Sequence, residues 1–384
     1  MTIDPGIVEG VRSRLIERGV RPSLPSVAQA LREQGRVLDD AGVWQLVEQV
    51  RSDLAGFGPL DGWIGAPGVT DVLINGPSEI WLDRGAGLER LDVRFRDEEA
   101  VRRLLQRLVN TAGRRIDDAQ PYVDVQLPAR VRLNAVLPPV SDRICISLRI
   151  ARRTAFTLEE LVLAGTVAQD LVPVISQLVA RRLSFLVCGG TGTGKTTVLA
   201  TLLGMVDHRC RLVLVEDTAE LLPDHPHVVK LEARRPNIEG QGAISMRDLV
   251  RQALRMRPDR LVVGEARGGE IVDLLAALNT GHEGGCGTIH ANSAQDVPAR
   301  IEALATAGGL DRSAAHSQMA AALDVVVELD RRPDGTRFVS AVATLERGSD
   351  GLVVSSPAWQ VSSEGAVGCG PGSDRWRHLV GRGC

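Results

Sequence analysis

The glycine-rich segment at residues 189–197 constrains the fold of this 384-residue chain more than any other feature. Its letters, GGTGTGKTT, match the pattern G-x-x-x-x-G-K-[ST], in which consecutive backbone N–H groups surround a phosphate. The apolar run at 182–188 is expected to form a buried strand, and 197–203 a helix that leaves the loop. The motif requires this strand–loop–helix context, so the sequence predicts an α/β domain that binds a polyphosphate.

Nine residues of this phosphate loop are predicted to bind a nucleotide. They are Gly189, Gly190, Thr191, Gly192, Thr193, Gly194, Lys195, Thr196 and Thr197. Lys195 is expected to reach the β- and γ-phosphates, and the Thr196 hydroxyl to hold Mg²⁺. Lys195 and Lys230 are the only lysines among 45 Lys and Arg residues, so the chain places a rare compact ammonium at this loop. The alternative is a glycine-rich helix start with a chance lysine.

Size, composition and charge limit the classes of protein to consider. With 384 residues and 44% hydrophobic content, the chain has enough apolar sequence for two or three globular domains. A net charge of −3 argues against a protein that mainly coats nucleic acid. The six cysteines contain no C-x-x-C pair, so we predict neither a structural zinc site nor disulfides. No apolar run is long enough to span a bilayer and the N-terminus does not resemble a signal peptide, so we expect a cytoplasmic protein.

Hydrophobic periodicity divides the first part of the chain into a helical segment and a small domain. Residues 1–60 are predicted to be helical and amphipathic. Residues 61–151 are predicted to form an α+β domain with an antiparallel sheet. Its expected strands are 71–75, 79–83, 88–93, 129–136 and 143–150, with a helix from about 97 to 113. Residues 152–160 are the expected linker to the next domain.

Strands that alternate with helices follow this linker. Continuous apolar runs of this kind predict a mainly parallel sheet with helices on both faces over residues 161–348. The expected strands are 184–188, 211–216, 260–264, 287–291, 325–329 and 338–345. Ligands of such sheets bind at the carboxyl ends of the strands. Beyond residue 348 the chain is rich in Gly and Ser and loses its periodicity, so 349–384 is predicted to be mostly disordered.

Three further segments place ionisable residues at these strand ends. EDTAE (216–220) ends the strand after the loop. In LVVGEAR (261–267) an acid is expected at position 264, but the chain has a glycine there and Glu265 follows. Residues 281–293 contain two histidines. Hydrolysis of a phosphoanhydride needs carboxylates that orient water and support the metal shell. The alternatives are a solvated helix N-terminus for the acids, and core or metal-binding histidines.

Together, GGTGTGKTT, EDTAE, LVVGEAR and GHEGGCGTIHANS, in this order and spacing, make the chain resemble the type II/IV secretion system ATPase superfamily. The resemblance covers about residues 50–345 and is closest to the tight-adherence (Flp) pilus assembly branch, which includes conjugal-transfer-associated ATPases. It implies an α/β protein with a RecA-like P-loop domain, preceded by a small α+β (PAS-like) N-domain. The sequence has no four-cysteine zinc module of the kind that some type II secretion and pilus-extension branches carry.

The resemblance also implies roles for single residues. Glu220 resembles the residue that activates water, Glu265 the residue that supports the Mg²⁺ and water shell, and His290 the γ-phosphate sensor. Arg132 and Arg149 match N-domain arginines that reach the phosphates, although exposed strand-edge arginines are the alternative. Family members form hexameric rings, so the resemblance implies ATP and Mg²⁺ as ligands and a homo-hexamer. Its expected partners are polytopic inner-membrane platform proteins, which would hold the ring at the inner face of the membrane.

Three functions stay open at this point. The first is a ring ATPase that powers pilus assembly or protein secretion. The second is a DNA-transfer motor on the same ATPase core; a channel for single strands needs basic and aromatic side chains, and only 3% of the residues are aromatic. The third is a scaffold that binds ATP without turnover, against which Lys195, Thr196, Glu220 and Glu265 all argue.

Overall fold

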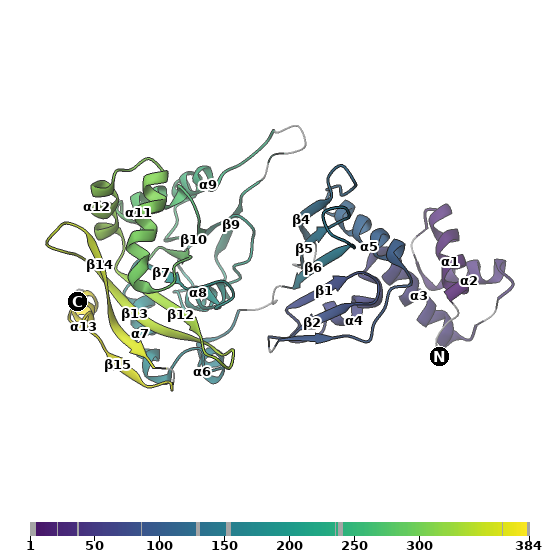
Figure 1. Ribbon diagram of the computed structural model, residues 1–384, viewed down its shortest axis with the longest axis horizontal. Helices are drawn as coiled ribbons and strands as arrows, with labels where there is room; N and C mark the ends of the chain where they lie inside the picture. Colours follow the sequence, from purple (N-terminus) through teal and green to yellow (C-terminus); the bar gives the residue numbers. More distant parts are fainter. Residues whose placement is uncertain are drawn as a thin grey trace. The chain divides into compact units, whose positions relative to one another are not determined.

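The computed structural model describes residues 5–20, 22–36, 38–85, 87–127, 131–150, 155–234, 236, 241–362 and 364–381. The chain divides into two compact units, Met1–Arg152 and Arg153–Cys384, and each is described by itself (Figure 1). The division falls at the start of the expected linker 152–160, of which 152–154 lie outside the described residues. Among the described helices, none combines the length and the apolar character that crossing a bilayer requires.

Three amphipathic helices open the first unit. They are α1 (Pro5–Glu17), α2 (Leu24–Glu33) and α3 (Asp40–Ala55). Ser23 caps α2 and Asp39 caps α3, since each side chain accepts a hydrogen bond from a backbone N–H of the first turn. Their apolar faces share one small core that includes Val11, Val27 and Leu46. These three helices lie within residues 1–60, for which the sequence predicts a helical segment.

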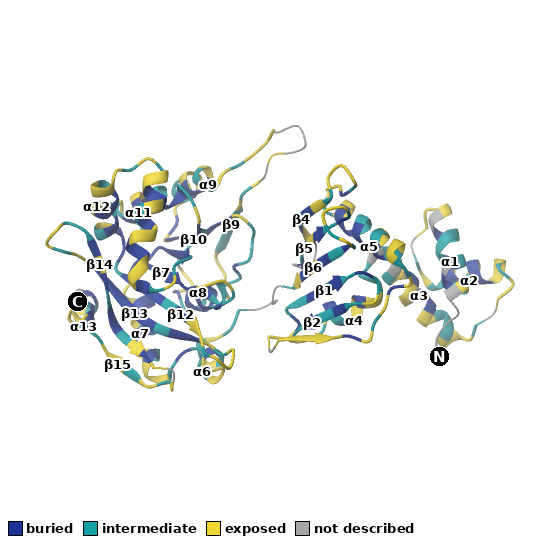
Figure 2. Cartoon of the chain, in the orientation of Figure 1, coloured by how far each residue is buried: buried dark blue, intermediate teal, exposed yellow. Residues whose placement is uncertain are grey.

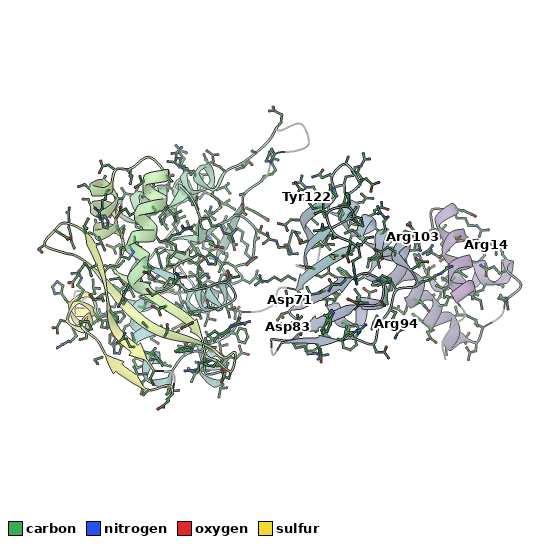
Figure 3. All side chains as sticks on the ribbon, in the orientation of Figure 1. Arg14, Asp71, Asp83, Arg94, Arg103 and Tyr122 are labelled. Atoms are coloured by element: carbon green, nitrogen blue, oxygen red, sulfur yellow. The ribbon has the colours of Figure 1, made fainter. Side chains whose placement is uncertain are left out.

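A six-stranded antiparallel sheet forms the rest of the first unit. Its order is β3-β2-β1-β6-β5-β4. The elements are η1 (Gly58–Leu60), α4 (Asp61–Ile64), β1 (Asp71–Asn75), β2 (Ile80–Asp83), β3 (Leu88–Arg90), α5 (Glu98–Thr111), β4 (Tyr122–Leu127), β5 (Val131–Val136) and β6 (Cys145–Ile150). In the five strands other than the exposed β3, alternate residues are buried and share a core with α5. Strand β4 was not predicted; it begins at the exposed Tyr122 and carries polar residues between buried ones (Figure 3).

A nine-stranded mixed sheet forms the second unit. Its order is β15-β14-β13-β12-β7-β11-β10-β8-β9, and β7 lies near the centre. The parallel strands are β7 (Phe185–Cys188), β8 (Leu212–Glu216), β9 (Val228–Glu232), β10 (Arg260–Ala266), β11 (Cys286–Ile289) and β12 (Val325–Arg331). Strand β7 (labelled in Figure 2) is buried along its whole length, and so are β8 and β11, as a sheet covered on both faces requires.

Helices cover both faces of this sheet. One core contains residues of α6 (Leu158–Leu163), α7 (Val172–Ala180) and α8 (Lys195–Gly204), and η3 (Gln169–Leu171) precedes α7. The other core contains residues of α9 (Met246–Ala253), α10 (Glu270–Leu278), α11 (Val297–Ala307) and α12 (Arg312–Ala322). Short helices η4 (Leu254–Met256) and η5 (Ala294–Asp296) complete the set. The predicted α/β class with a mainly parallel sheet is confirmed.

The prediction of a disordered tail was wrong. After β13 (Arg337–Arg347), β14 (Val353–Val361) and β15 (Val367–Cys369) extend the sheet antiparallel at one edge, and the helix α13 (Ser373–Gly381) follows. The rings of Trp359 and Trp376 pack edge to face with centroids 4.8 Å apart. A Cβ on Gly370 would lie 2.2 Å from the Pro357 carbonyl oxygen. This glycine therefore serves close backbone packing. Composition alone does not distinguish such a segment from a disordered one.

Candidate active site

The phosphate loop connects β7 to α8 as the sequence predicted. Gly194 takes the N-cap position of α8 with a φ of 95°, a left-handed conformation that L side chains rarely adopt. No side chain among the described residues caps this helix end. Its first N–H groups and the positive end of the helix dipole therefore face the place where a phosphate would bind.

Lys195 lies at the mouth of this loop. Its side chain is only 7% exposed, and Nζ donates to the carbonyl oxygens of Gly189 (2.9 Å) and Gly190 (2.7 Å). Burial lowers the pKa of Lys195, although the charge of Glu265 opposes that shift. Within the described part of the chain no carboxylate forms an ion pair with Lys195. A buried ammonium that donates to two carbonyl oxygens and has no ion-paired carboxylate fits a polyphosphate, which would supply the missing counter-charge.

Glu265 and His290 meet Lys195 at the carboxyl ends of β10 and β11. His290 Nε2 lies 2.7 Å from Glu265 Oε1, and its Nδ1 lies 3.5 Å from Lys195 Nζ. Because an ammonium can only donate, Nδ1 is the acceptor and the ring proton resides on Nε2. Arg267 Nη2 donates to Glu265 Oε2 at 2.6 Å. The structure thus brings three of the predicted catalytic residues into one cluster.

The electrostatics of this cluster favour an ionised Glu265 and a neutral His290. Burial opposes charge on Glu265, but the hydrogen bond from Arg267 and the nearby cations outweigh burial and lower its pKa. Burial, followed by the charge of Lys195, lowers the pKa of His290. The Glu265–His290 approach is a close contact and not an aligned hydrogen bond, because Oε1 has no partner of suitable geometry among the described residues. Oε1 therefore has unused acceptor capacity while it is buried from solvent in this arrangement.

Glu216, the last residue of β8, belongs to the predicted acidic segment, but the sequence reasoning gave it no role of its own. It is 4% exposed, and its Oε1 accepts the backbone N–H groups of Glu220 (3.0 Å) and Leu221 (2.8 Å). Burial raises the pKa of Glu216, while these two hydrogen bonds act in the opposite direction. Its Oε2 has no hydrogen-bond partner among the described residues. The carboxylate therefore fixes the backbone of the acidic segment.

Gly264 makes room for Glu216. A Cβ on Gly264 would lie 2.6 Å from Glu216 Cγ, so a side chain at this position would displace the carboxylate. The register of β10 against β11 shifts between Val263 and Ala266, and the Gly264 carbonyl accepts a hydrogen bond from Thr288 Oγ1 at 2.7 Å. Such an irregularity redirects the next side chain, here Glu265. The sequence carried a sign of this arrangement. Gly264 stands where an acid is expected, and β8, the strand that follows the phosphate loop, ends in Glu216.

The remaining predicted residues occupy separate places. Glu220 is half-buried in the segment after β8, and Thr196 is half-buried in the first turn of α8. Arg132 and Arg149 belong to the first unit, where they are directly opposite each other on β5 and β6. Arg132 donates two hydrogen bonds to Asp124, at 2.9 and 2.8 Å, whereas Arg149 is exposed. The catalytic roles of these four residues stay predictions.

The described residues do not provide a preformed set of metal ligands. Among the described residues, no group of three or more His, Cys, Asp or Glu side chains could hold a metal ion. Mg²⁺ in nucleotide sites typically binds one or two protein oxygens, phosphate oxygens and water. The Thr196 hydroxyl and the Glu265 carboxylate suit that kind of coordination, because each can offer a single oxygen.

Comparison with known proteins agrees with this geometry. The type II/IV secretion system protein family matches residues 53–343. A putative conjugal transfer protein of Mycobacterium tuberculosis is 52% identical over 330 residues, which cover 84% of this chain and 94% of the relative. VirB11, a type IV secretion system protein of Brucella suis, is 32% identical over 267 residues, 62% of this chain and 73% of that protein.

A solved structure shows the same fold. The pilus retraction motor PilT with bound ADP aligns with a TM-score of 0.53 and 21% identity, over 72% of this chain and 78% of PilT. At this level of identity the likeness concerns the fold alone. The sequence and family matches go further: the chain belongs to the type II/IV secretion system protein family and is an ATPase of that family.

Proposed function

We propose that the chain hydrolyses ATP with Mg²⁺ as a homo-hexameric ring, and that it powers pilus assembly or protein secretion through polytopic inner-membrane platform proteins. Such a ring would work in the cytoplasm, peripherally at the inner face of the membrane. The observation that supports hydrolysis best is the cluster of Lys195, Glu265 and His290 at the mouth of the phosphate loop. It combines a phosphate-binding cation, an ionised carboxylate and a neutral imidazole within direct contact.

Each residue has a task that its surroundings allow. The loop residues 189–197 and the N–H groups of α8 bind the phosphates, and Lys195 exchanges its two carbonyl acceptors for phosphate oxygens. Thr196 and Glu265 would hold Mg²⁺, which supplies charge neutralisation when bound. Glu220 orients and deprotonates the attacking water, on a backbone that Glu216 fixes. His290 contacts both Lys195 and Glu265, so it can report whether a γ-phosphate is present.

The first test is Lys195→Ala. Turnover should fall by at least about 10³-fold because the ammonium that stabilises the transferred phosphoryl group is lost. The variant should still fold and unfold cooperatively, because the lost ammonium faces the phosphate site and not an apolar core. Steady-state ADP production and thermal unfolding measure the two effects. The control is Arg209→Ala: Arg209 is 90% exposed and precedes β8, at the opposite end of the strands from the loop. Normal turnover by Lys195→Ala would overturn this assignment of the active site.

If the protein works as a ring, neighbouring subunits should raise one another's ATP turnover. Turnover per chain should rise with protein concentration, in step with assembly measured by sedimentation. Arg149→Ala and Arg132→Ala should lower kcat more than they raise the KM for ATP, since a contact made on closure acts in the transition state. Arg149 is the cleaner probe because Arg132 also holds Asp124. A kcat that is independent of concentration and of both substitutions would contradict the ring and the arginine roles together.

The second candidate function is a DNA-transfer motor on the same ATPase core. The name of the 52% identical relative, a putative conjugal transfer protein, favours it. The low aromatic content of the chain gives single strands few platforms for stacking. Stimulation of ATP turnover by single-stranded DNA at physiological salt would favour this candidate, and indifference to DNA would favour the secretion motor.

A further inference from the structure

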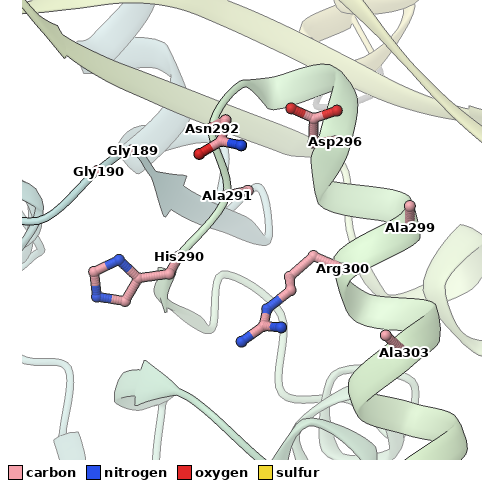
Figure 4. Close-up of a pocket in the computed structure, with 9 residues that line it drawn as sticks. All are labelled: Gly189, Gly190, His290, Ala291, Asn292, Asp296, Ala299, Arg300 and Ala303. Atoms are coloured by element: carbon pink, nitrogen blue, oxygen red, sulfur yellow. The ribbon is translucent and has the colours of Figure 1, made fainter.

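A pocket of about 470 Å³ lies beside the phosphate loop, on the side of α11. Gly189 and Gly190 of the loop line one side, and His290 lines it at the end of β11 (Figure 4). Arg300 of α11 reaches into it from the opposite side. The two glycines are those whose carbonyls hold Lys195, so the pocket adjoins the place where the γ-phosphate is expected.

Arg300 brings an unneutralised positive charge to this pocket. Its side chain is exposed, and it forms no hydrogen bond or ion pair with the described residues. Asp296, one turn earlier, also lines the pocket, but its carboxylate accepts the Ser293 hydroxyl at 2.8 Å and does not pair with Arg300. The charge of Arg300 is one of those that lower the pKa of His290, which agrees with their closeness. A guanidinium placed in this way can bind an anion with two parallel hydrogen bonds.

The remaining walls leave the space between His290 and Arg300 open (Figure 4). Ala291, Ala299 and Ala303 have short side chains, so a small tetrahedral anion can enter without displacing them. His290 stands between Lys195 and the pocket's interior, in contact with the first and lining the second. The negative charge of Asp296 weakens the binding of any anion there, which suits a ligand that stays briefly.

We propose that this pocket is a subsite for inorganic phosphate, in which Arg300 holds the product after cleavage and before release. The proposal rests on the proposed ATP hydrolysis. When water attacks, its oxygen forms a bond to the γ-phosphorus, the bond to the β,γ-bridging oxygen breaks, and ADP leaves with that electron pair. Phosphate and one proton are released. Phosphate that departs on the side of His290 meets Arg300 next.

The test measures product inhibition by inorganic phosphate in the full chain, with turnover followed through ADP. Arg300→Ala should raise the inhibition constant for phosphate by about fivefold or more, as expected for the loss of one charge-assisted contact. The KM for ATP should stay within about twofold. Arg300→Lys should restore part of the inhibition because it keeps the charge but not the fork of donors. Arg209→Ala is the matched control, an exposed arginine at the far end of the strands.

A second measurement does not depend on turnover. In the presence of ADP, added phosphate should raise the unfolding temperature of the wild type and of Arg209→Ala more than that of Arg300→Ala. The comparison among variants removes the general stabilising effect of phosphate as a salt. Equal inhibition constants and equal temperature shifts in wild type and Arg300→Ala would overturn the subsite.

A different result would reassign Arg300. If Arg300→Ala raises the KM for ATP as much as it raises the inhibition constant for phosphate, Arg300 binds the γ-phosphate of ATP and the separate subsite is refuted. If the wild type does not hydrolyse ATP at all, the proposed function fails. In that case the temperature shift alone decides whether the pocket binds phosphate.

Discussion

Two buried cations lie at opposite ends of the parallel strands in the second unit, Arg260 at the amino ends and Lys195 at the carboxyl ends, and among the described residues only Lys195 has an ionisable side chain among its partners. At the amino ends, Arg260 is 4% exposed and donates to the carbonyl oxygens of Gly284 (3.1 Å) and Val179 (2.7 Å). The exposed Asp259 and the half-buried Asp324 also accept backbone N–H groups, those of Arg211 and Ser184. Main-chain partners fix the loops they belong to, so these charges stabilise the fold.

At the carboxyl ends, ionisable side chains contact one another. Lys195, Glu265, His290 and Arg267 form one connected group in which each member has at least one charged or titratable neighbour. Such contacts can be exchanged when a polyphosphate arrives, because no loop has to unfold to release them. The difference teaches that burial of a charge does not by itself indicate a catalytic role. The nature of the partner is the better guide.

The largest expected effect at the amino ends is on stability. Arg260→Ala removes the donors of two buried carbonyls and leaves a cavity, so the free energy of unfolding should fall by about 3 kcal/mol. The KM for ATP should stay close to that of the wild type. Urea unfolding and steady-state kinetics measure the two quantities, with the exposed Arg209→Ala as the control from the same end of the strands. A raised KM with unchanged stability would mean that the comparison between the two ends is wrong.

At the carboxyl ends the expected effect is on turnover. Glu220→Gln should lower kcat by about 10²-fold while ATP still binds, because a group that acts on the attacking water is lost. Glu265→Gln should lower kcat less than Glu220→Gln does. It should weaken Mg²⁺ binding, so a higher Mg²⁺ concentration should be needed for half-maximal turnover. Neither change should move the free energy of unfolding by more than about 1 kcal/mol. If Glu265→Gln proves the more damaging of the two, the roles of the two glutamates are reversed.

The sequence predicted those parts of the site that follow from strand order. Parallel strands put their carboxyl ends on one edge, so the meeting of Lys195, Glu265 and His290 could be expected from three motifs. The space that Gly264 leaves for Glu216 could not be expected in the same way, because it depends on which strands are neighbours and on a local irregularity of β10.

Two other features escaped sequence reasoning for different physical reasons. Arg300 lies on a helix after the histidine motif, and its relation to His290 requires the angle at which α11 leaves the sheet. In the tail, glycine that serves close packing looks the same in composition as glycine that serves flexibility. Only the pairing of β14 with β13 separates the two.

The smallest expected effect is a pH dependence at the carboxyl ends. Burial and the charge of Lys195 hold the pKa of His290 below its ordinary value, so His290 is neutral at pH 7. Below about pH 6.5 the unfolded chain binds this proton before the folded chain does, so stability falls as the pH drops from 6.5 through the lowered pKa. Protonation would also end the acceptor role of Nδ1 toward Lys195, and kcat/KM should fall in the same window. Profiles of kcat/KM and of the free energy of unfolding between pH 5 and pH 8 should both lose this step in His290→Gln. A step that survives in His290→Gln would assign it to another group, and the neutral imidazole would then have no part in the cluster's function.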